Sequence, residues 1–231
     1  MRPRAIRGLN LELRDANPGG ARFVAIAGNI GAGKSTLTSF LEARFGIQPF
    51  YEPNDTNPYL EDFYADMHQW AFHSQMYFLS HKFRLHMELS RSDGTCVQDR
   101  TIYEDAVFAK MLADEGIMEE RDYRTYLNLF KHMSNFMRRP NVIVFLDLSP
   151  ETSMARIKER SRDVESGISM EYLQALHREY HAFIQNISRT VPVIRVDYER
   201  YRNAEEMASV IEREYLNSSF IRDAGWTPTQ G

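Results

Sequence analysis

The sequence is poor in several features that mark whole classes of protein. It has a single cysteine, Cys96, which excludes a disulfide framework within one chain and leads us to expect a reducing, cytoplasmic setting. No apolar run reaches the length of a transmembrane helix, so we expect no membrane partner. The net charge of −4 leaves no basic excess, which argues against nucleic acid as a partner. Internal repeats and low-complexity tracts are also absent.

The two ends of the chain differ in composition from its middle. Residues 1–21 carry several arginines but lack the apolar core of a secretory signal, and Glu12 and Asp15 argue against a transit peptide. We expect a flexible N-terminal extension over 1–21, one domain over 22–217 and a frayed polar tail over 218–231. A chain of 231 residues is long enough to bury a substantial core.

Apolar, strand-like runs alternate with helical periodicity along the chain. This alternation is typical of βαβ units and predicts an α/β fold with a parallel sheet. The run Asn141–Asp147 is apolar on both faces, as a central parallel strand should be. The expected strands are 22–27, 47–51, 95–98, 142–147 and 192–196. The expected helices are 34–45, 56–65, 67–90, 103–114, 121–138, 150–160, 169–188 and 204–215.

Residues Gly28–Thr36 form a complete phosphate-binding loop of the G-x-x-x-x-G-K-[ST] type. The loop follows an expected strand and opens an expected helix, which is the context in which this motif binds a nucleotide. Its backbone N–H groups and the helix N-terminus attract phosphate oxygens, while Lys34 reaches the β- and γ-phosphates and Ser35 binds Mg²⁺. The expected phosphate-binding residues are Gly28, Asn29, Ile30, Gly31, Ala32, Gly33, Lys34, Ser35 and Thr36.

Charged residues follow the second and third expected strands. Glu52 follows the second strand, and Asp99 with Arg100 follows the third. Because parallel strands end at one edge of a sheet, these side chains should meet Lys34 there and supply what phosphoryl transfer needs. Glu52 is suited to accept the proton of an attacking hydroxyl, Asp99 to hold Mg²⁺, and Arg100 to steady the phosphoryl group. Each residue alone is also typical of a solvated surface, so the hypothesis rests on their joint placement.

A basic cluster, Arg156, Arg160 and Arg162, ends one of the expected helices. Arg156 and Arg160 share a helix face because they lie four residues apart. Arg162 begins a loop that contains Gly167, so the segment 156–169 is a candidate for a mobile lid over bound phosphates. An ordinary basic helix face is the alternative that these residues leave open.

The stretch 64–82 carries an apolar and aromatic stripe at helical spacing, and Gln75 lies in the middle of it. Such a stripe is usually core, but a buried amide must be hydrogen-bonded and offers both a donor and an acceptor to a nucleobase. Asp105 is suited to accept from an exocyclic base amine by the same logic. We therefore interpret this region as a candidate acceptor pocket.

The motifs together resemble those of the deoxyribonucleoside kinases over roughly residues 22–215. The resemblance implies a P-loop kinase fold with a five-stranded parallel sheet flanked by helices on both sides, in a homodimer. It also implies phosphorylation of a deoxynucleoside 5′-hydroxyl, with ATP as donor and Mg²⁺ as cofactor. Within the family the chain is similar to bacterial deoxyadenosine kinases. The segments in family order are the phosphate loop, Tyr51-Glu52-Pro53, Trp70-x-x-x-x-Gln75, Asp99–Asp105 and Arg156-x-x-x-Arg160-x-Arg162-x-x-Glu165.

The resemblance assigns roles to the charged residues near the phosphates. Glu52 matches the family's catalytic base, Arg100 the arginine beside that base, and Asp99 an acidic residue associated with Mg²⁺. Asn57 departs from the family, which often has an aromatic residue there. The residues that match the phosphate-binding lid are Arg156, Arg160 and Arg162.

The resemblance also assigns the acceptor pocket. Tyr64 and Glu165 match the pair that hydrogen-bonds the sugar 3′-hydroxyl, and Gln75 and Asp105 match the base-reading residues. Lys82 stands where purine and deoxycytidine kinases carry an arginine. Because lysine lacks the planar fork of arginine, base recognition is expected to differ in detail.

The favoured hypothesis is a salvage enzyme that phosphorylates deoxyadenosine, with deoxyguanosine and deoxycytidine as further candidates. A nucleoside monophosphate kinase is the close alternative, but its acceptor is already ionised and has no use for a base such as Glu52. A non-catalytic nucleotide-binding subunit is the second alternative. That subunit should have lost Lys34, Glu52 or a lid arginine, and the sequence keeps them all.

Overall fold

The computed structural model describes most of the expected kinase domain. The predicted terminal segments 1–21 and 218–231 lie outside the described residues, and so do Glu52 and Arg162. None of the helices within the described residues combines the length and the hydropathy of a membrane span. The described residues are 22–51, 57–160, 165, 167–199, 205, 206, 208, 209 and 211.

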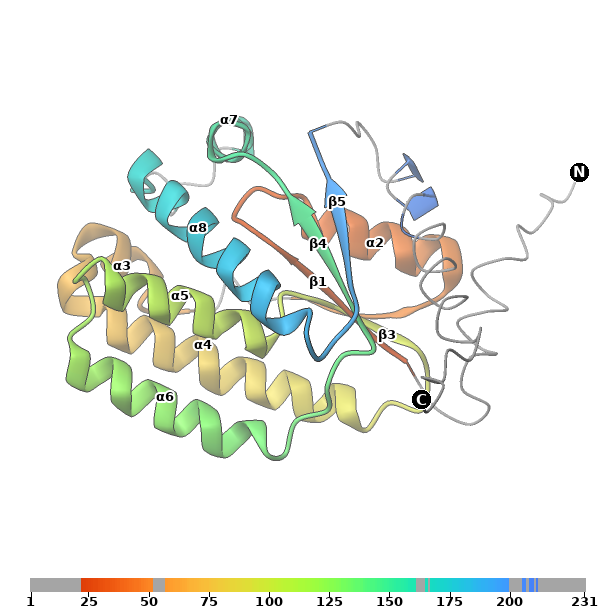
Figure 1. Cartoon of the computed structure of the whole chain (residues 1–231), viewed down its shortest axis with the longest axis horizontal. Coiled ribbons are helices and arrows are strands. Elements are labelled where there is room, and N and C mark those ends of the chain that lie inside the picture. The colour runs from red at the N-terminus through yellow and green to blue at the C-terminus, as the bar shows by residue number, and fades with distance from the viewer. Residues whose placement is uncertain are drawn as a thin grey trace, which may run out of the picture.

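A five-stranded sheet forms the centre of the molecule, with the strand order β2-β3-β1-β4-β5 (Figure 1). All four pairings between neighbouring strands are parallel. The chain runs from β1 to β2 and back to β3 on one side of β1, and then crosses to β4 and β5 on the other side. The strand order therefore reverses at β1, where open α/β sheets bind ligands. The strands are β1 (Phe23–Gly28), β2 (Gln48–Phe50), β3 (Cys96–Asp99), β4 (Val142–Asp147) and β5 (Val193–Asp197).

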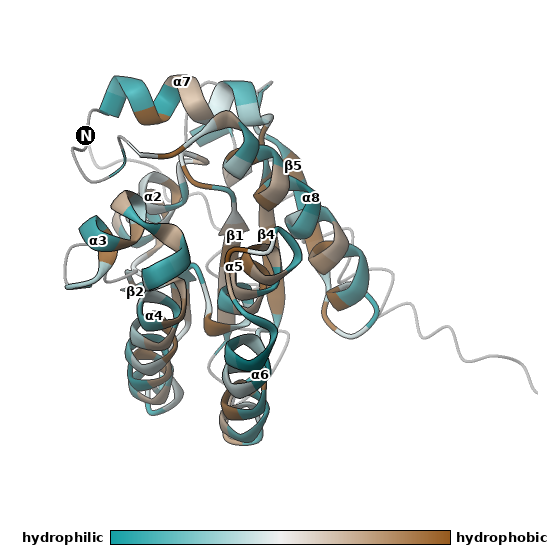
Figure 2. Cartoon of the chain, turned by 90° about the vertical axis from the view of Figure 1, so that its left-hand side faces the viewer, coloured by the Kyte–Doolittle hydropathy of each residue, from teal (hydrophilic) through white to brown (hydrophobic). Residues whose placement is uncertain are grey.

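Helices cover both faces of the sheet, as predicted. Figure 1 shows α2 on one face and α4, α5 and α8 on the other, and Figure 2 shows α6 alongside α4 and α5. The helices in the described residues are α2 (Lys34–Phe45), α3 (Leu60–Ala65), α4 (Met67–Ser90), α5 (Ile102–Asp114), α6 (Glu120–Ser134), α7 (Pro150–Arg160) and α8 (Met170–Ile187).

The alternation of side chains along each strand produces two separate cores. Ala25 and Phe145 face the layer of α4, α5 and α8, whereas Ile26 and Val144 pack against Leu37 of α2. Each of the larger side chains contributes roughly 1.5–3 kcal/mol when fully buried. Packing on both faces therefore holds the central strands in place. The loops that follow their carboxyl ends are thereby held in defined positions.

Two helix ends differ from the prediction for identifiable reasons. The helix expected over 56–65 begins at Leu60, because the side-chain oxygen of Asn57 accepts the N–H of Tyr59 at 3.0 Å and forms a turn. The helix expected over 121–138 ends at Ser134. The chain beyond it leaves helical geometry, and the N–H of Arg138 donates to a side chain of α4 instead.

That side chain is His86, which is fully buried and edge-on to Phe23 and Tyr103. Its Nε2 accepts the N–H of Arg138 at 2.9 Å, so the ring is neutral with its proton on Nδ1. Burial lowers the pKa of His86 from 6.5 to about 4. As the pH falls, His86 is therefore protonated in the unfolded chain at a higher pH than in the folded chain. The folded state loses stability between pH 6.5 and pH 4 for this reason. This loss amounts to roughly 3 kcal/mol.

We expect the His86→Gln variant to lose less stability than wild type between pH 6.5 and pH 4, because glutamine keeps an acceptor but takes up no proton. Urea unfolding at a series of pH values would measure the difference between the two chains. His68→Gln, an exposed change on the same helix, serves as control. Parallel stability profiles for His86→Gln and wild type would show that His86 does not titrate as its burial requires.

Candidate active site

The phosphate loop connects β1 to α2 at the carboxyl edge of the sheet, and its backbone needs glycine at two positions. Gly31 and Gly33 have φ values of 78° and 77°, in the left-handed region. A Cβ on Gly31 would lie 2.9 Å from the backbone oxygen of Ser153, and one on Gly33 would lie 2.9 Å from the Tyr198 side chain. The close approach of α7 and of the segment after β5 therefore holds the loop in shape.

Lys34, the first residue of α2, folds back over this loop. Its Nζ donates to the carbonyl oxygens of Gly28 and Asn29, at 3.0 Å each. The side chain is only 7% exposed, and it lines the cavity described below. The ammonium group is therefore held beside the helix N-terminus, where a phosphate would be most strongly attracted.

The two residues predicted to bind Mg²⁺ are brought together. The hydroxyl of Ser35 donates to Oδ2 of Asp99 at 2.5 Å. The other carboxylate oxygen of Asp99 is buried and has no hydrogen-bond partner within the described part of the chain. An unsatisfied buried carboxylate beside a hydroxyl offers the hard oxygen ligands that Mg²⁺ prefers, so these residues fit the ion.

Arg100 lies in the turn after β3 and has an unusual backbone conformation. Its φ of 56° makes it the one non-glycine residue with positive φ among the described residues. Such a conformation costs about 1–3 kcal/mol and persists where the surroundings require it, often at functional sites. The guanidinium lies over the ring of Phe108, 4.6 Å from the centroid, and borders the cavity.

Glu104 is a buried carboxyl that the sequence analysis missed. Its Oε1 accepts the N–H of Thr101 at 3.0 Å, and its Oε2 accepts the hydroxyl of Tyr180 at 3.1 Å and the N–H of Gly28 at 3.4 Å. Burial raises the pKa of Glu104 to about 7, against the opposing effect of nearby cations led by Arg100. A signal was present, since Thr-x-x-Glu at the start of a helix is a capping box.

One cavity of about 280 Å³ joins the phosphate loop to the predicted acceptor pocket. Its walls include Phe78, Phe108 and Tyr172, which the sequence analysis did not single out. Aromatic residues at helical spacing look like ordinary core in a sequence, so nothing marked them. The predicted site residues that line the cavity are Ile30, Gly31, Gly33, Lys34, Ser35, Thr36, Tyr64, Gln75, Lys82, Asp99, Arg100, Asp105, Arg160 and Glu165.

The far end of the cavity contains a buried ion pair between Lys82 of α4 and Asp105 of α5. Gln75 lies on the same wall of the cavity, and it is buried as well. A buried ion pair costs desolvation energy, and removing one partner typically costs about 3–5 kcal/mol because the other charge is left uncompensated. Lys82 therefore supplies the counter-charge of the Asp105 carboxylate.

The two predicted lid arginines that the structure describes, Arg156 and Arg160, lie at different places. Arg160 forms an ion pair with Glu165 at the cavity. Arg156 does not line the cavity, because its guanidinium lies over the ring of Tyr198, 4.3 Å from the centroid. The Tyr198 ring also lies beside Gly33, so it stands between Arg156 and the phosphate loop.

The chain is similar in sequence and in structure to known proteins. A model of the family "Deoxynucleoside kinase" matches residues 24–221. The deoxyadenosine kinase of Dictyostelium discoideum is 45% identical over 208 residues, which cover 90% of this chain and 84% of the relative. The deoxyadenosine/deoxycytidine kinase of Bacillus subtilis is 37% identical over 197 residues, which cover 83% and 90%. The structure of deoxyadenosine kinase from M. mycoides with bound dATP matches with a TM-score of 0.76 and 28% identity, over 84% of this chain and 98% of that one.

Proposed function

Because the chain belongs to the deoxynucleoside kinase family, we propose that it transfers the γ-phosphoryl group of ATP to the 5′-hydroxyl of deoxyadenosine. The observation that carries this proposal is that one cavity is lined both by Lys34 and by the buried pair of Lys82 and Asp105. A nucleoside whose 5′ end faces the phosphate loop would place its base at that pair. The family also makes the chain an enzyme, which disfavours the alternative of a non-catalytic subunit.

The described residues supply most of the parts that phosphoryl transfer needs. Lys34 neutralises phosphate charge from the helix N-terminus, and Arg100 and Arg160 offer guanidinium groups to the transferred phosphoryl oxygens. Ser35 and Asp99 would hold Mg²⁺, which supplies charge neutralisation across the β- and γ-phosphates when bound. The role of Glu52 as general base stays a prediction, as does that of Arg162.

The pocket chemistry favours an acceptor base with an exocyclic amine. Asp105 supplies a carboxylate and Gln75 an amide, which together can accept from an amine and donate to a ring nitrogen. Tyr64 and Glu165 border the same cavity, as a pair for the sugar hydroxyl requires. Deoxyadenosine kinase from M. mycoides binds dATP and dCTP, which both carry such an amine. Adenine comes first because deoxyadenosine kinases are among the relatives most similar to this chain.

The homodimer, the cytoplasmic location and the contact of Arg156 with ATP stay predictions that rest on the family and the composition. Size-exclusion chromatography with light scattering would test the dimer directly. A measured molar mass equal to that of one chain, at the protein concentration of the kinase assay, would overturn the proposed homodimer. It would not affect the proposed reaction.

A steady-state assay of the full chain with ATP and Mg²⁺ tests the function. We expect kcat/KM to be highest for deoxyadenosine and lowest for thymidine, with deoxyguanosine and deoxycytidine between them. Deoxyadenosine monophosphate should give no turnover, because it is a substrate for a nucleoside monophosphate kinase and not for a nucleoside kinase. A preference for another nucleoside would overturn the assignment of deoxyadenosine as the acceptor. Activity on none of the nucleosides would overturn the proposed function itself.

The Asp105→Asn variant tests the acceptor end of the cavity. The change removes the carboxylate at nearly constant size, so we expect the kcat/KM ratio of deoxyadenosine to thymidine to fall by about 10²-fold. It also leaves Lys82 buried without its partner, so the free energy of unfolding should fall by about 3 kcal/mol or more.

The double variant Asp105→Asn/Lys82→Met separates the two effects of that change. It removes both charges, so we expect it to regain most of the stability without regaining the preference for deoxyadenosine. Urea unfolding measures the first quantity and competition between the two nucleosides the second. An unchanged substrate ratio in this well-folded double variant would show that Asp105 does not recognise the base.

A further inference from the structure

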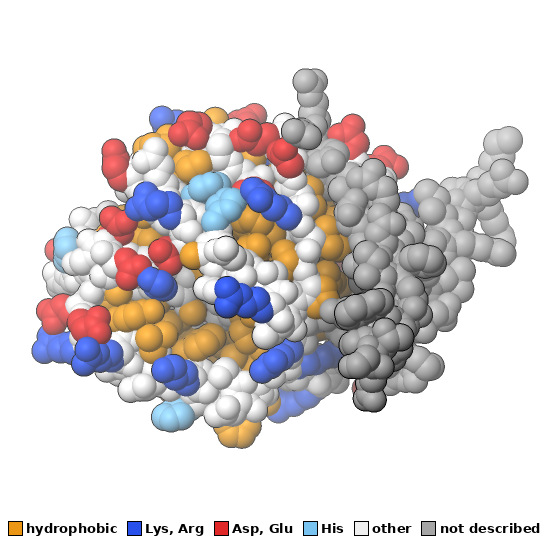
Figure 3. Space-filling model, in the orientation of Figure 1, with side chains coloured by type: hydrophobic (Ala, Val, Ile, Leu, Met, Phe, Trp, Pro, Cys, Tyr) orange, Lys and Arg blue, Asp and Glu red, His pale blue; other side chains and the backbone are white. Residues whose placement is uncertain are grey.

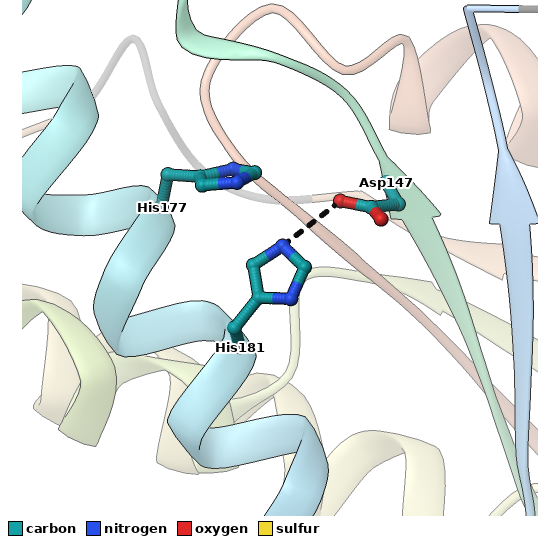
Figure 4. A group of neighbouring side chains, drawn as sticks. All are labelled: Asp147, His177 and His181. Atoms are coloured by element: carbon teal, nitrogen blue, oxygen red, sulfur yellow. Dashed lines mark hydrogen bonds and ion pairs between the residues drawn. The ribbon is translucent and has the colours of Figure 1, made fainter.

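Three side chains outside the cavity form a compact group of metal-ligand type. His177 and His181 lie on α8, and Asp147 is the last residue of β4. One potential ligand atom of each lies within 4.8 Å of the other two. Figure 4 shows both imidazole rings projecting from the same side of α8 toward the carboxylate. None of the three residues borders the substrate cavity, so the proposed kinase reaction gives them no role.

The spacing of these atoms suits a small divalent ion. His177 and His181 are four residues apart, so they lie one above the other on the helix. The Nε2 of His181 is 3.1 Å from Oδ1 of Asp147. Two ligand atoms of a tetrahedral ion, each about 2.1 Å from it, lie about 3.4 Å from one another. This contact needs to open by only a few tenths of an ångström, whereas ligand atoms of the group that lie up to 4.8 Å apart would have to approach one another.

Neighbouring groups hold the carboxylate and one imidazole in place. The Nε of Arg195 donates to Oδ2 of Asp147 at 2.7 Å, which leaves Oδ1 toward His181. The backbone of Leu148 is a hydrogen-bonding neighbour of the His177 ring. Outer contacts of this kind are typical of imidazoles that bind metals.

The group is also accessible from solvent. The side chain of His181 is 36% exposed and that of Asp147 14% exposed, and Figure 3 shows histidines gathered on the surface over α8. Burial and the neighbouring His181 lower the pKa of His177, which favours the neutral ring that a metal requires. The charge of Arg195 opposes a cation, while the carboxylate of Glu151 near His177 offsets part of that charge.

We propose that Asp147, His177 and His181 form a binding site for Zn²⁺ or a similar divalent transition-metal ion. Two imidazoles and one carboxylate are a common three-ligand set for zinc, whereas Mg²⁺ prefers oxygen ligands alone. The ion would join α8, which carries Tyr172 in the cavity wall, to the carboxyl end of β4. Because the site exists only in the folded chain, binding stabilises the fold.

Isothermal titration of the full chain with ZnCl₂ tests this proposal. Excess Mg²⁺ is kept present so that the site at Ser35 and Asp99 is occupied by its own ion. We expect one Zn²⁺ per chain with micromolar affinity and a rise in Tm of about 5 °C at a hundredfold excess over Kd. His177→Gln and His181→Gln should each weaken binding by about 100-fold or more. His68→Gln, an exposed change on α4, should bind as wild type does.

Equal Tm values without zinc would show that these variants fold normally. If one of these variants folds less well, the visible spectrum of Co²⁺ bound to the wild-type chain tests the site instead. Tetrahedral coordination that includes imidazole gives intense absorption. Weak octahedral absorption, zinc affinity unchanged in both histidine variants, or no saturable zinc binding by wild type would each overturn the proposal. Failure of the nucleoside assay would not bear on it, because the site needs no substrate.

Discussion

The Lys34→Met variant is expected to lose at least about 10³-fold in kcat/KM for deoxyadenosine, because it removes a fixed positive charge from the site of phosphoryl transfer. The structure places this charge at the proposed site of transfer, with Nζ held by two loop carbonyls beside the N-terminus of α2. In a site shielded from water a fixed charge is worth far more than at the surface. Methionine keeps the length of the stem, so the fold of the loop should survive.

Two measurements separate a loss of chemistry from a loss of structure. Thermal unfolding of Lys34→Met should remain within a few degrees of wild type, while ATP binding weakens. Lys110→Met is the matched control, because Lys110 is exposed and pairs with Asp114 at the surface. That control should keep full activity. More than about a tenth of wild-type activity in Lys34→Met would remove this lysine from the transfer step.

The Arg100→Met variant is expected to lower kcat by about 10²- to 10³-fold with a smaller change in KM. The guanidinium lies on Phe108 in the cavity wall, and the strained backbone at Arg100 shows that the turn is held in this conformation by its surroundings. A group that acts mainly on the transferring phosphoryl stabilises the transition state more than the bound substrate. Its removal should therefore affect turnover first.

Arg178→Met provides the comparison for this change, because Arg178 is an exposed arginine on α8 that pairs with Glu115. Steady-state kinetics with varied deoxyadenosine at saturating ATP would measure both constants. A rise in KM at unchanged kcat would mean that Arg100 only binds the acceptor, contrary to the role proposed here.

Most of the helices and strands could be predicted because their determinants are local, whereas the five-stranded sheet with helices on both faces was implied by the family resemblance. The hydrophobic periodicity indicates where the helices and strands lie. The phosphate-binding motif indicates that the first strand ends at the nucleotide site. The expected strand over 142–147 coincides with β4, and the expected helix over 150–160 coincides with α7. Predictions failed at helix ends such as Ser134, where a contact from Arg138 to His86 across the core replaces the next helical turn.

Many of the predicted site residues line one cavity, but the contacts between them could not be predicted. Arg156 and Arg160 share a helix face, yet one helical turn separates them, so one reaches Tyr198 and the other reaches Glu165. Nothing in the sequence near either arginine states which partner it meets. The pairing of Lys82 with Asp105 likewise depends on how α4 and α5 pack, which only the assembled fold determines.

The position of Glu104 has a consequence for changing the enzyme's specificity. Glu104 holds the donor loop through Gly28, and the next residue along α5, Asp105, holds the acceptor end through Lys82. Substitutions in this first turn of α5 will therefore alter donor and acceptor binding together, whether they arise by selection or by design. Gln75, on the facing helix α4, is buried and has no hydrogen bond to the loop among those of the described residues. New base preferences should be easier to reach through Gln75 than through the first turn of α5.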